Sequence, residues 1–225
     1  METRPEPTAF SALREHRLVA AIRAASPEAA QEASVAIARG GIRHIEITFT
    51  IPEATRVMRA LAADESMIVG AGTVLTAAQA RAALDAGAQF LIAPNLSREV
   101  AEVARDVGVM YAPGAYTTTE ILAARAAGAH LVKVYPVGVA GGPQYIRVIR
   151  DPLPDLPMMA SGGTTLENML PFLMAGCMAV GLGAAVCDPA LVAAGKWGEI
   201  TALARAFGQR LRQAYATGTV AKAVP

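Results

Sequence analysis

Short apolar runs alternate with amphipathic segments along almost the whole chain. Runs of β-branched and other apolar residues predict buried strands, and apolar residues spaced three and four positions apart predict helices. The predicted strands span residues 18–23, 42–49, 67–71, 89–93, 109–112, 130–135, 157–161 and 178–183. The predicted helices span residues 8–17, 27–39, 52–63, 77–86, 98–107, 118–127, 166–175 and 197–216. Several helices are followed by a glycine that suits a left-handed C-cap, namely Gly41, Gly87, Gly108, Gly128 and Gly176.

Strands that alternate with helices in this way indicate parallel β/α units, and eight such units close most economically as a (β/α)8 barrel. An open doubly wound sheet is the alternative, but the first strand-to-helix turn, residues 23–27, lacks a glycine-rich dinucleotide fingerprint. We therefore expect one α/β TIM-barrel domain over residues 18–217. A short helical extension over 1–17 would precede it, and a tail over 218–225 would follow it.

Composition narrows the classes of partner. The net charge is +1 and no basic cluster is present, so we expect neither nucleic acid nor a membrane as a partner. The uncharged stretch 169–187 could be mistaken for a membrane span, but it is broken by proline and glycine and predicts a helix end, a turn and a strand.

The cysteines, the histidines and the first residues indicate a compartment and the absence of a metal motif. Residues 1–11 contain no apolar signal core, and two cysteines are too few for a disulfide framework, so we expect a cytoplasmic protein. The three histidines form no spaced ligand set with the cysteines, so we expect no metal and no cofactor.

One lysine lies in the middle of the apolar strand 130–135. Lys133 is one of three lysines, and the other two, Lys196 and Lys222, lie near the C-terminus. Burial disfavours the ammonium form and lowers the pKa of an amine, and a neutral amine forms Schiff bases with carbonyl substrates. The alternative is a lysine whose stem packs in the core while its head reaches solvent.

The second predicted strand places a carboxylate in the barrel. Its period of two puts Glu46, Thr48 and Thr50 on the face opposite to the apolar set Ile45, Ile47 and Phe49, which should face the helices. A glutamate inside a barrel is costly unless it is paired or protonated. We therefore expect Glu46 to be a general acid/base beside Lys133, and the alternative is an ion pair that only fixes packing.

Other predicted strand ends carry residues suited to bind a substrate. Arg23 could hold a carboxylate with its planar fork, or it could pair with a neighbouring loop. Thr73 offers a hydroxyl after a glycine-rich strand end, where small residues let a substrate approach the backbone. Pro94, Pro113 and the proline after Tyr135 mark where strands stop and loops begin. The Tyr135 ring could form a wall of the site or pack in the core.

Glycine-rich loops follow the last two predicted strands. One contains Ser161, Gly162 and Gly163, and the other contains Gly183 and Ala184. Loops of this kind after strands 7 and 8 of a barrel, with a helix N-terminus behind them, form the usual phosphate site. The pair of loops therefore predicts a site for an anionic group distal to the reacting carbons.

Together these segments resemble the family of 2-keto-3-deoxy-6-phosphogluconate (KDPG) and 4-hydroxy-2-oxoglutarate (KHG) aldolases. The matching segments are 45–52 (IEITFTIP), 70–74 (GAGTV), 133–136 (KVYP) and 162–163 (GG), and the similarity covers about residues 17–215. The resemblance implies that Lys133 forms the Schiff base and that Glu46 moves the protons. It also implies that Arg23, Thr50 and Thr73 bind the pyruvyl carboxylate and nearby oxygens. Members of the family are expected to be trimeric barrels that need no metal.

The chain departs from the family pattern at four positions. Many members have arginine in place of Thr50, threonine in place of Ser161, phenylalanine in place of Tyr135, and serine in place of Ala184. The serine helps hold a phosphate in those members. The lysine and the glutamate are intact, so the resemblance implies the reaction class but does not fix the distal part of the substrate.

The sequence therefore predicts a class I aldolase that binds a 2-keto acid and splits a KDPG-like sugar acid into pyruvate and glyceraldehyde 3-phosphate. The alternative substrates are 4-hydroxy-2-oxoglutarate, the galactonate epimer, or another 2-keto-3-deoxy acid that is 6-substituted or unphosphorylated. A sugar-phosphate isomerase or epimerase with Glu46 as base, or a sugar-acid binding protein on the same scaffold, are alternative functions. The resemblance implies a homotrimer.

Overall fold

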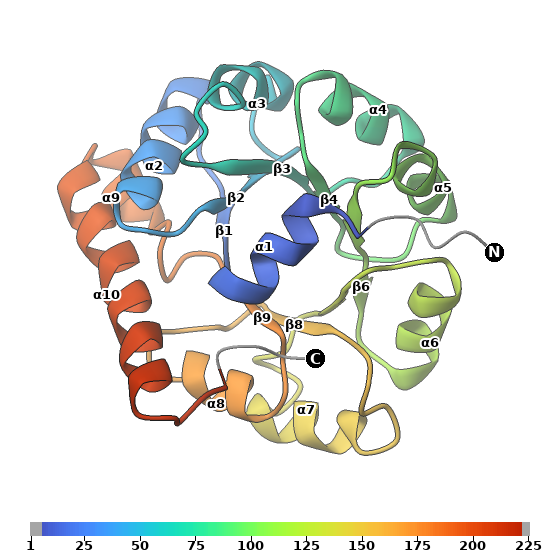
Figure 1. Ribbon diagram of the computed structural model, residues 1–225. Helices are drawn as coiled ribbons and strands as arrows, with labels where there is room; N and C mark the ends of the chain where they lie inside the picture. The colour runs from blue at the N-terminus through green and yellow to red at the C-terminus, as the bar shows by residue number, and fades with distance from the viewer. Residues whose placement is uncertain (1–5, 222–225) are drawn as a thin grey trace.

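The predicted apolar runs form strands, and all of these strands pair in parallel. The computed structural model describes residues 6–221, and Figure 1 shows all of its helices except the first arranged as a ring around the strands. The strands are β1 (Leu18–Ile22), β2 (His44–Thr48), β3 (Ile68–Gly72), β4 (Phe90–Ile92), β5 (Met110–Ala112), β6 (Gly114–Ala115), β7 (Val132–Val134), β8 (Met158–Ser161) and β9 (Ala179–Leu182). Their order in the sheet is β5-β4-β3-β2-β1-β9-β8-β7-β6.

The two ends of this order are joined, because β5 and β6 are halves of one strand interrupted at Pro113. The interruption does not end the pairing, since the backbone N–H of Lys133 in β7 donates to the Pro113 carbonyl at 2.9 Å. Proline removes a donor and leaves an acceptor, so a strand can continue past it on the side that only accepts. The eight predicted strands therefore form one closed (β/α)8 barrel.

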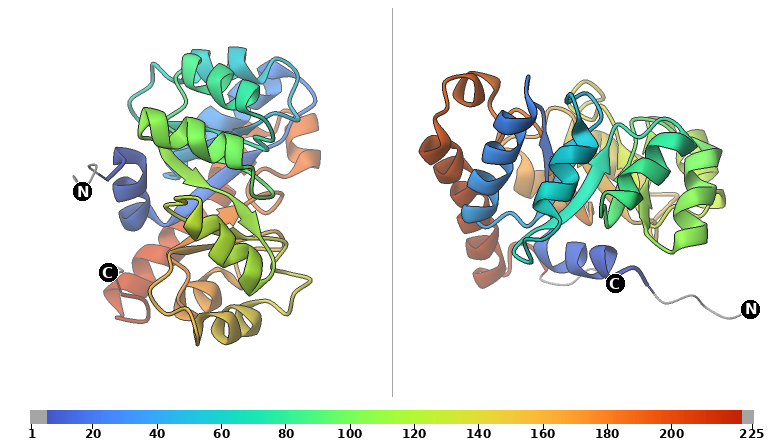
Figure 2. Two further views of the ribbon diagram at one scale, coloured as in Figure 1. Left: turned by 90° about the vertical axis from the view of Figure 1, so that its right-hand side faces the viewer. Right: turned by 90° about the horizontal axis from the view of Figure 1, so that it is seen from above.

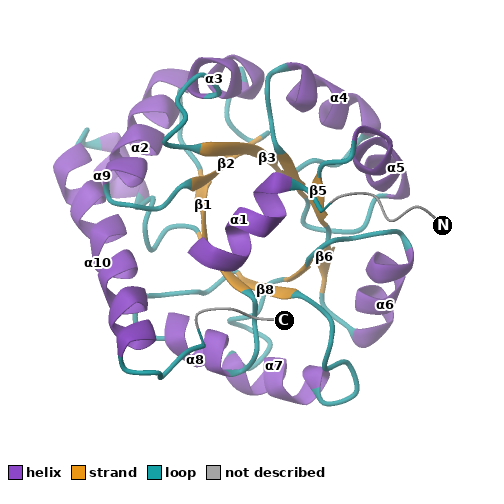
Figure 3. Cartoon of the chain, viewed as in Figure 1, coloured by secondary structure: helices purple, strands orange, loops and turns teal. Residues whose placement is uncertain are grey.

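The helices surround the barrel, except for the first, which lies across one end of it (Figure 3). They are α1 (Thr8–His16), α2 (Pro27–Arg39), α3 (Ala54–Leu61), α4 (Ala77–Asp85), α5 (Arg98–Val107), α6 (Thr118–Ala126), α7 (Pro143–Arg150), α8 (Met169–Met174), α9 (Pro189–Ala193) and α10 (Trp197–Ala216). The prediction lacked α7 and α9. It also started the helix after β8 too early, at residue 166, because a hydrogen-bonded turn between Thr165 and Asn168 precedes α8.

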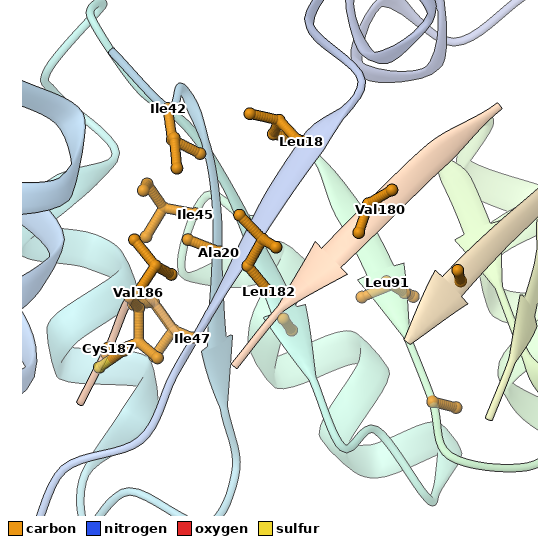
Figure 4. Close-up of a cluster of buried hydrophobic side chains, with 14 of the residues drawn as sticks. Leu18, Ala20, Ile42, Ile45, Ile47, Leu91, Val180, Leu182, Val186 and Cys187 are labelled. Carbon is orange, nitrogen blue, oxygen red and sulfur yellow. The ribbon is translucent and has the colours of Figure 1, made fainter. Parts of the chain in front are cut away.

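The buried apolar side chains form two layers. The outer layer lies between strands and helices, and Figure 4 shows Ile45, Ile47 and Leu182 within it. The inner layer fills the barrel, where Phe90 and Met159 belong to the same apolar cluster as Phe10 and Leu13 of α1. Helix α1 thus closes the amino-terminal end of the barrel, as Figures 1 and 2 show. The carboxyl ends of the strands remain as the open side.

The proposed domain boundaries and the ends of the chain are not settled by the structure. The boundaries proposed at residues 17/18 and 217/218 stay predictions, and residues 1–5 and 222–225, which include Lys222, lie outside the described part. None of the helices within residues 6–221 is both long enough and apolar enough to cross a membrane.

Candidate active site

A cleft of about 580 Å³ opens at the carboxyl ends of β1, β7, β8 and β9. Eight of the predicted site residues line it together, namely Arg23, Lys133, Tyr135, Ser161, Gly162, Gly163, Gly183 and Ala184. Ala21, Thr164, Thr165 and Ala185 complete the lining. These residues come from four strand ends that are distant in the sequence, so closure of the barrel is what assembles the cleft.

Lys133 lies in the middle of β7 and points into the barrel. Its side chain is 6% exposed, and the exposed part contributes to the cleft. The ammonium nitrogen lies 5.1 Å from the centre of the Tyr135 ring, within the range of a cation–π contact. Tyr135 follows Lys133 by two residues, so the two side chains project to the same side of the chain. The ring therefore forms a wall beside the amine and is not part of the core.

Glu46 also points inward, as the period of β2 predicted, and is 3% exposed. Its carboxyl group leans across the neighbouring strand β3 and occupies the space where Gly72 has no side chain. A methyl group built on Gly72 would lie only 2.1 Å from Glu46 Oε1. No ion pair within 4.0 Å joins Glu46 to Lys133 in the described part of the chain, so the packing ion pair considered above is not formed.

The other predicted substrate-binding residues, Pro94, Thr50 and Thr73, do not line this cleft. Pro94 lines a second cleft, of about 470 Å³, which shares the Tyr135 ring with the first. Thr50 is exposed at the end of β2, and Thr73 is partly exposed after β3. The Thr73 backbone has φ +56°, an uncommon conformation for a β-branched residue that is often found at functional sites. Thr50, Thr73 and Glu46 line neither cleft directly.

The glycine-rich loop after β8 is held by hydrogen bonds that the strand and helix patterns did not predict. Gly138 N–H donates to the Gly162 carbonyl at 2.7 Å, and the Asn168 side-chain amide donates to the Gly163 carbonyl at 2.9 Å. Gly162 and Gly163 have φ +80° and +88°, which favours glycine at both positions. The Thr-x-x-Asn spacing of Thr165 and Asn168 was the available signal for this turn.

One expectation about the anion site is wrong. We expected the N-terminus of a helix over residues 166–175 behind this loop, but α8 starts only at Met169 and spans six residues. The effect of a helix dipole is confined to its first turn. An anion in this loop would therefore rely on backbone N–H groups and hydroxyls.

A (β/α)8 barrel with a nearly buried lysine that lines a glycine-rich cleft can support Schiff-base chemistry. A sequence model of the KDPG and KHG aldolase family matches residues 10–203. The chain belongs to this family, so the resemblance noted above is confirmed and the protein is an aldolase.

Individual relatives agree with this assignment. A probable 2-dehydro-3-deoxy-6-phosphogalactonate aldolase of Rhizobium meliloti is 36% identical over 182 residues, which cover 80% of this chain and 85% of the relative. A 2-dehydro-3-deoxy-phosphogluconate aldolase of Pseudomonas aeruginosa is 32% identical over 180 residues, covering 79% and 81%. The structure of the Legionella pneumophila KDPG aldolase with pyruvate captured as a covalent carbinolamine is 25% identical, with a TM-score of 0.82 and coverage of 91% and 99%.

Proposed function

We propose that the protein reversibly cleaves a 2-keto-3-deoxy-6-phospho sugar acid into pyruvate and glyceraldehyde 3-phosphate. The observation that carries this proposal is the nearly buried Lys133 amine, which reaches the cleft from inside the barrel. The relatives include enzymes named for both the gluconate and the galactonate substrate, so either configuration at C4 is compatible with the family.

In the proposed mechanism the neutral Lys133 amine attacks the C2 carbonyl, and loss of water gives an iminium ion. The electrons of the C3–C4 bond then move into the iminium, which becomes an enamine, while the C4 hydroxyl proton passes to Glu46. The aldehyde departs, Glu46 returns the proton to C3, and water hydrolyses the imine to release pyruvate. Glu46 therefore acts first as base and then as acid.

The remaining residues would bind the two ends of the substrate. Arg23 lies exposed at the cleft rim, where its fork suits a carboxylate, and Thr73 would contribute a hydroxyl to the same group. Thr50 would contact a nearby oxygen. Pro94 and Tyr135 would form the walls on the two sides of the reacting carbons.

The distal phosphate would be held by the loops after β8 and β9. These loops contain Ser161, Gly162, Gly163, Gly183 and Ala184. None of these five residues carries a cationic side chain, and Ala184 offers no hydroxyl. A short substrate such as 4-hydroxy-2-oxoglutarate is therefore the second candidate.

Reduction with borohydride in the presence of pyruvate tests the mechanism. We expect one reduced pyruvyl group per chain, and peptide mapping should place it on Lys133. Lys133→Arg should be inactive and unlabelled although it keeps the charge, because a guanidinium stays protonated. Labelling of Lys196 or Lys222 instead would overturn the proposal, and an isomerase or a simple binding protein would give no labelling.

We further propose that the protein is a homotrimer in the cytoplasm. Apolar side chains are exposed on several outer helices, including Val107, Leu122, Val148 and Met174. Such surface favours a closed oligomer. Light scattering that gave a stable monomer would contradict the trimer. The two cysteines are free and buried, which suits a reducing compartment.

A further inference from the structure

Thr48 is the last residue of β2, and its hydroxyl connects two strand ends at the mouth of the barrel. The side chain is fully buried. Its Oγ1 lies 2.8 Å from the carbonyl oxygen of Ile22, the last residue of β1, and 2.7 Å from Oγ1 of Thr50. The Ile22 carbonyl directly precedes Arg23, so one hydroxyl holds both the backbone that leads to Arg23 and the side chain of Thr50.

Counting protons fixes the direction of these two hydrogen bonds. A threonine hydroxyl has one proton, and a carbonyl oxygen can only accept. The Thr48 proton is therefore donated to the Ile22 carbonyl. The remaining bond then requires Thr50 to donate its own proton to Thr48. Thr50 consequently presents only lone pairs toward the open side of the barrel.

A group with only lone pairs cannot hydrogen-bond a carboxylate, which at neutral pH also only accepts. It can accept a proton from a hydroxyl. On the substrate of the proposed function, the pyruvyl half has a carboxylate, a carbonyl and a methyl or methylene carbon, and its imine nitrogen would sit on β7. Every substrate hydroxyl belongs to the half that leaves as the aldehyde.

We propose that Thr50 accepts a hydrogen bond from a hydroxyl that the aldehyde-derived half carries beyond C4, since the C4 hydroxyl gives its proton to Glu46, and that Thr48 is the buried positioning residue that imposes this polarity. The inference rests on the proposed aldolase function and assigns the carboxylate to Arg23 and Thr73 without Thr50. A neutral hydrogen bond of this kind corresponds to about a 2-fold to 12-fold preference for a hydroxylated aldehyde.

The test compares two acceptors in the condensation with pyruvate, D-glyceraldehyde and propanal, which have the same number of carbons. The measured quantity is the ratio of their kcat/KM values, which does not depend on the fraction of enzyme that is folded. Thr50→Val should lower the ratio by the factor given above. Thr48→Val should lower it as well, and Thr48→Ser should restore it because serine keeps the hydroxyl.

Thr201→Val is the matched control. The Thr201 hydroxyl also donates to a backbone carbonyl at 2.8 Å, that of Ala36, but it joins α10 to α2 away from the cleft. The ratio should stay at the wild-type value in this variant. A change in Thr201→Val as large as that in Thr48→Val would show that loosening the fold suffices, and would overturn the positioning role.

An unchanged ratio in Thr50→Val would overturn the assignment of Thr50. If KM for pyruvate also increased in that variant, the result would place Thr50 on the carboxylate. Failure of the aldolase function itself looks different, because the wild-type protein would then show neither borohydride labelling with pyruvate nor condensation with either aldehyde.

Discussion

Gly72→Ala should separate proton transfer from imine formation, because this glycine makes room for the Glu46 carboxyl group. The backbone of Gly72 does not require a positive φ, so alanine is compatible with the strand. The added methyl carbon would lie 2.1 Å from Glu46 Oε1, 2.5 Å from Cγ and 2.7 Å from Cδ. To reach ordinary contact at 3.4 Å, the carboxyl oxygen must move by about 1 Å.

A displacement of this size should lower the rate of proton transfer more than it lowers the stability of the fold. Misplacing a reacting group by about 1 Å can cost about 10²-fold in rate. We therefore expect the exchange of the pyruvate methyl protons with deuterium to fall about 100-fold. The atoms that must move include Cγ as well as the carboxyl group of a buried side chain, and such overpacking costs about 1–3 kcal/mol. The reduced freedom of the unfolded chain offsets about 0.4–1 kcal/mol of this cost. The free energy of unfolding should therefore fall by less than about 3 kcal/mol.

Two assays on the same protein check this prediction. Proton NMR in D₂O follows the exchange of the methyl group, and borohydride trapping with mass spectrometry measures imine formation on Lys133. Gly198→Ala serves as a control, since a methyl group there meets no atom within 4 Å. Wild-type exchange in Gly72→Ala would refute the assignment of Glu46 as the acid/base. If Gly72→Ala lost both borohydride trapping and methyl exchange, the claim that only proton transfer depends on this position would be refuted.

Further predictions concern Glu46, Ala184 and His44. Glu46→Gln should keep imine formation but lose about 10²- to 10⁴-fold in methyl exchange, measured by the same NMR assay. Ala184→Ser should lower KM for the 6-phosphorylated substrate by about tenfold or more and leave KM for 4-hydroxy-2-oxoglutarate unchanged, because the added hydroxyl can donate to a charged group. Improvement of both substrates would show that the distal group does not lie there. Burial lowers the pKa of His44 to about 4, so between that pH and about 6.5 the unfolded chain binds more protons than the folded one. Urea unfolding should therefore show stability falling as pH drops, by about 2 kcal/mol from this residue between pH 8 and pH 5, and His44→Gln should flatten that dependence.

The barrel could be predicted because its signals are local. Each strand shows its own apolar run, and several helices begin at a residue whose side chain accepts a hydrogen bond from the first turn, as Ser26, Thr76 and Ser97 do. Helix α7 escaped prediction because it follows two glycines and begins with Pro143, which together have the composition of a turn. Proline is equally suited to the first helical position, so only packing decides between the two.

The strand period and the strand ends predicted part of the candidate site. Period two correctly turned Glu46 inward, and the strand ends placed Lys133 and the glycine loops in one cleft. The role of Gly72 was not visible, because it depends on the direction in which a side chain of one strand leans over the next. The position of Tyr135 between two clefts likewise results from contacts among several strand ends.

Arg17, between α1 and β1, ties the beginning of the barrel to its end. The side chain is 1% exposed, and its three donors reach the carbonyls of Met178, Cys177 and Ala221, each at 2.8 Å. The neighbouring strand β1 similarly pairs with β9, the last strand of the chain. During synthesis on the ribosome these partners emerge 160 to 204 residues after Arg17. The guanidinium must therefore stay hydrated while most of the chain is made, and the residue that begins the barrel is among the last to find its partners.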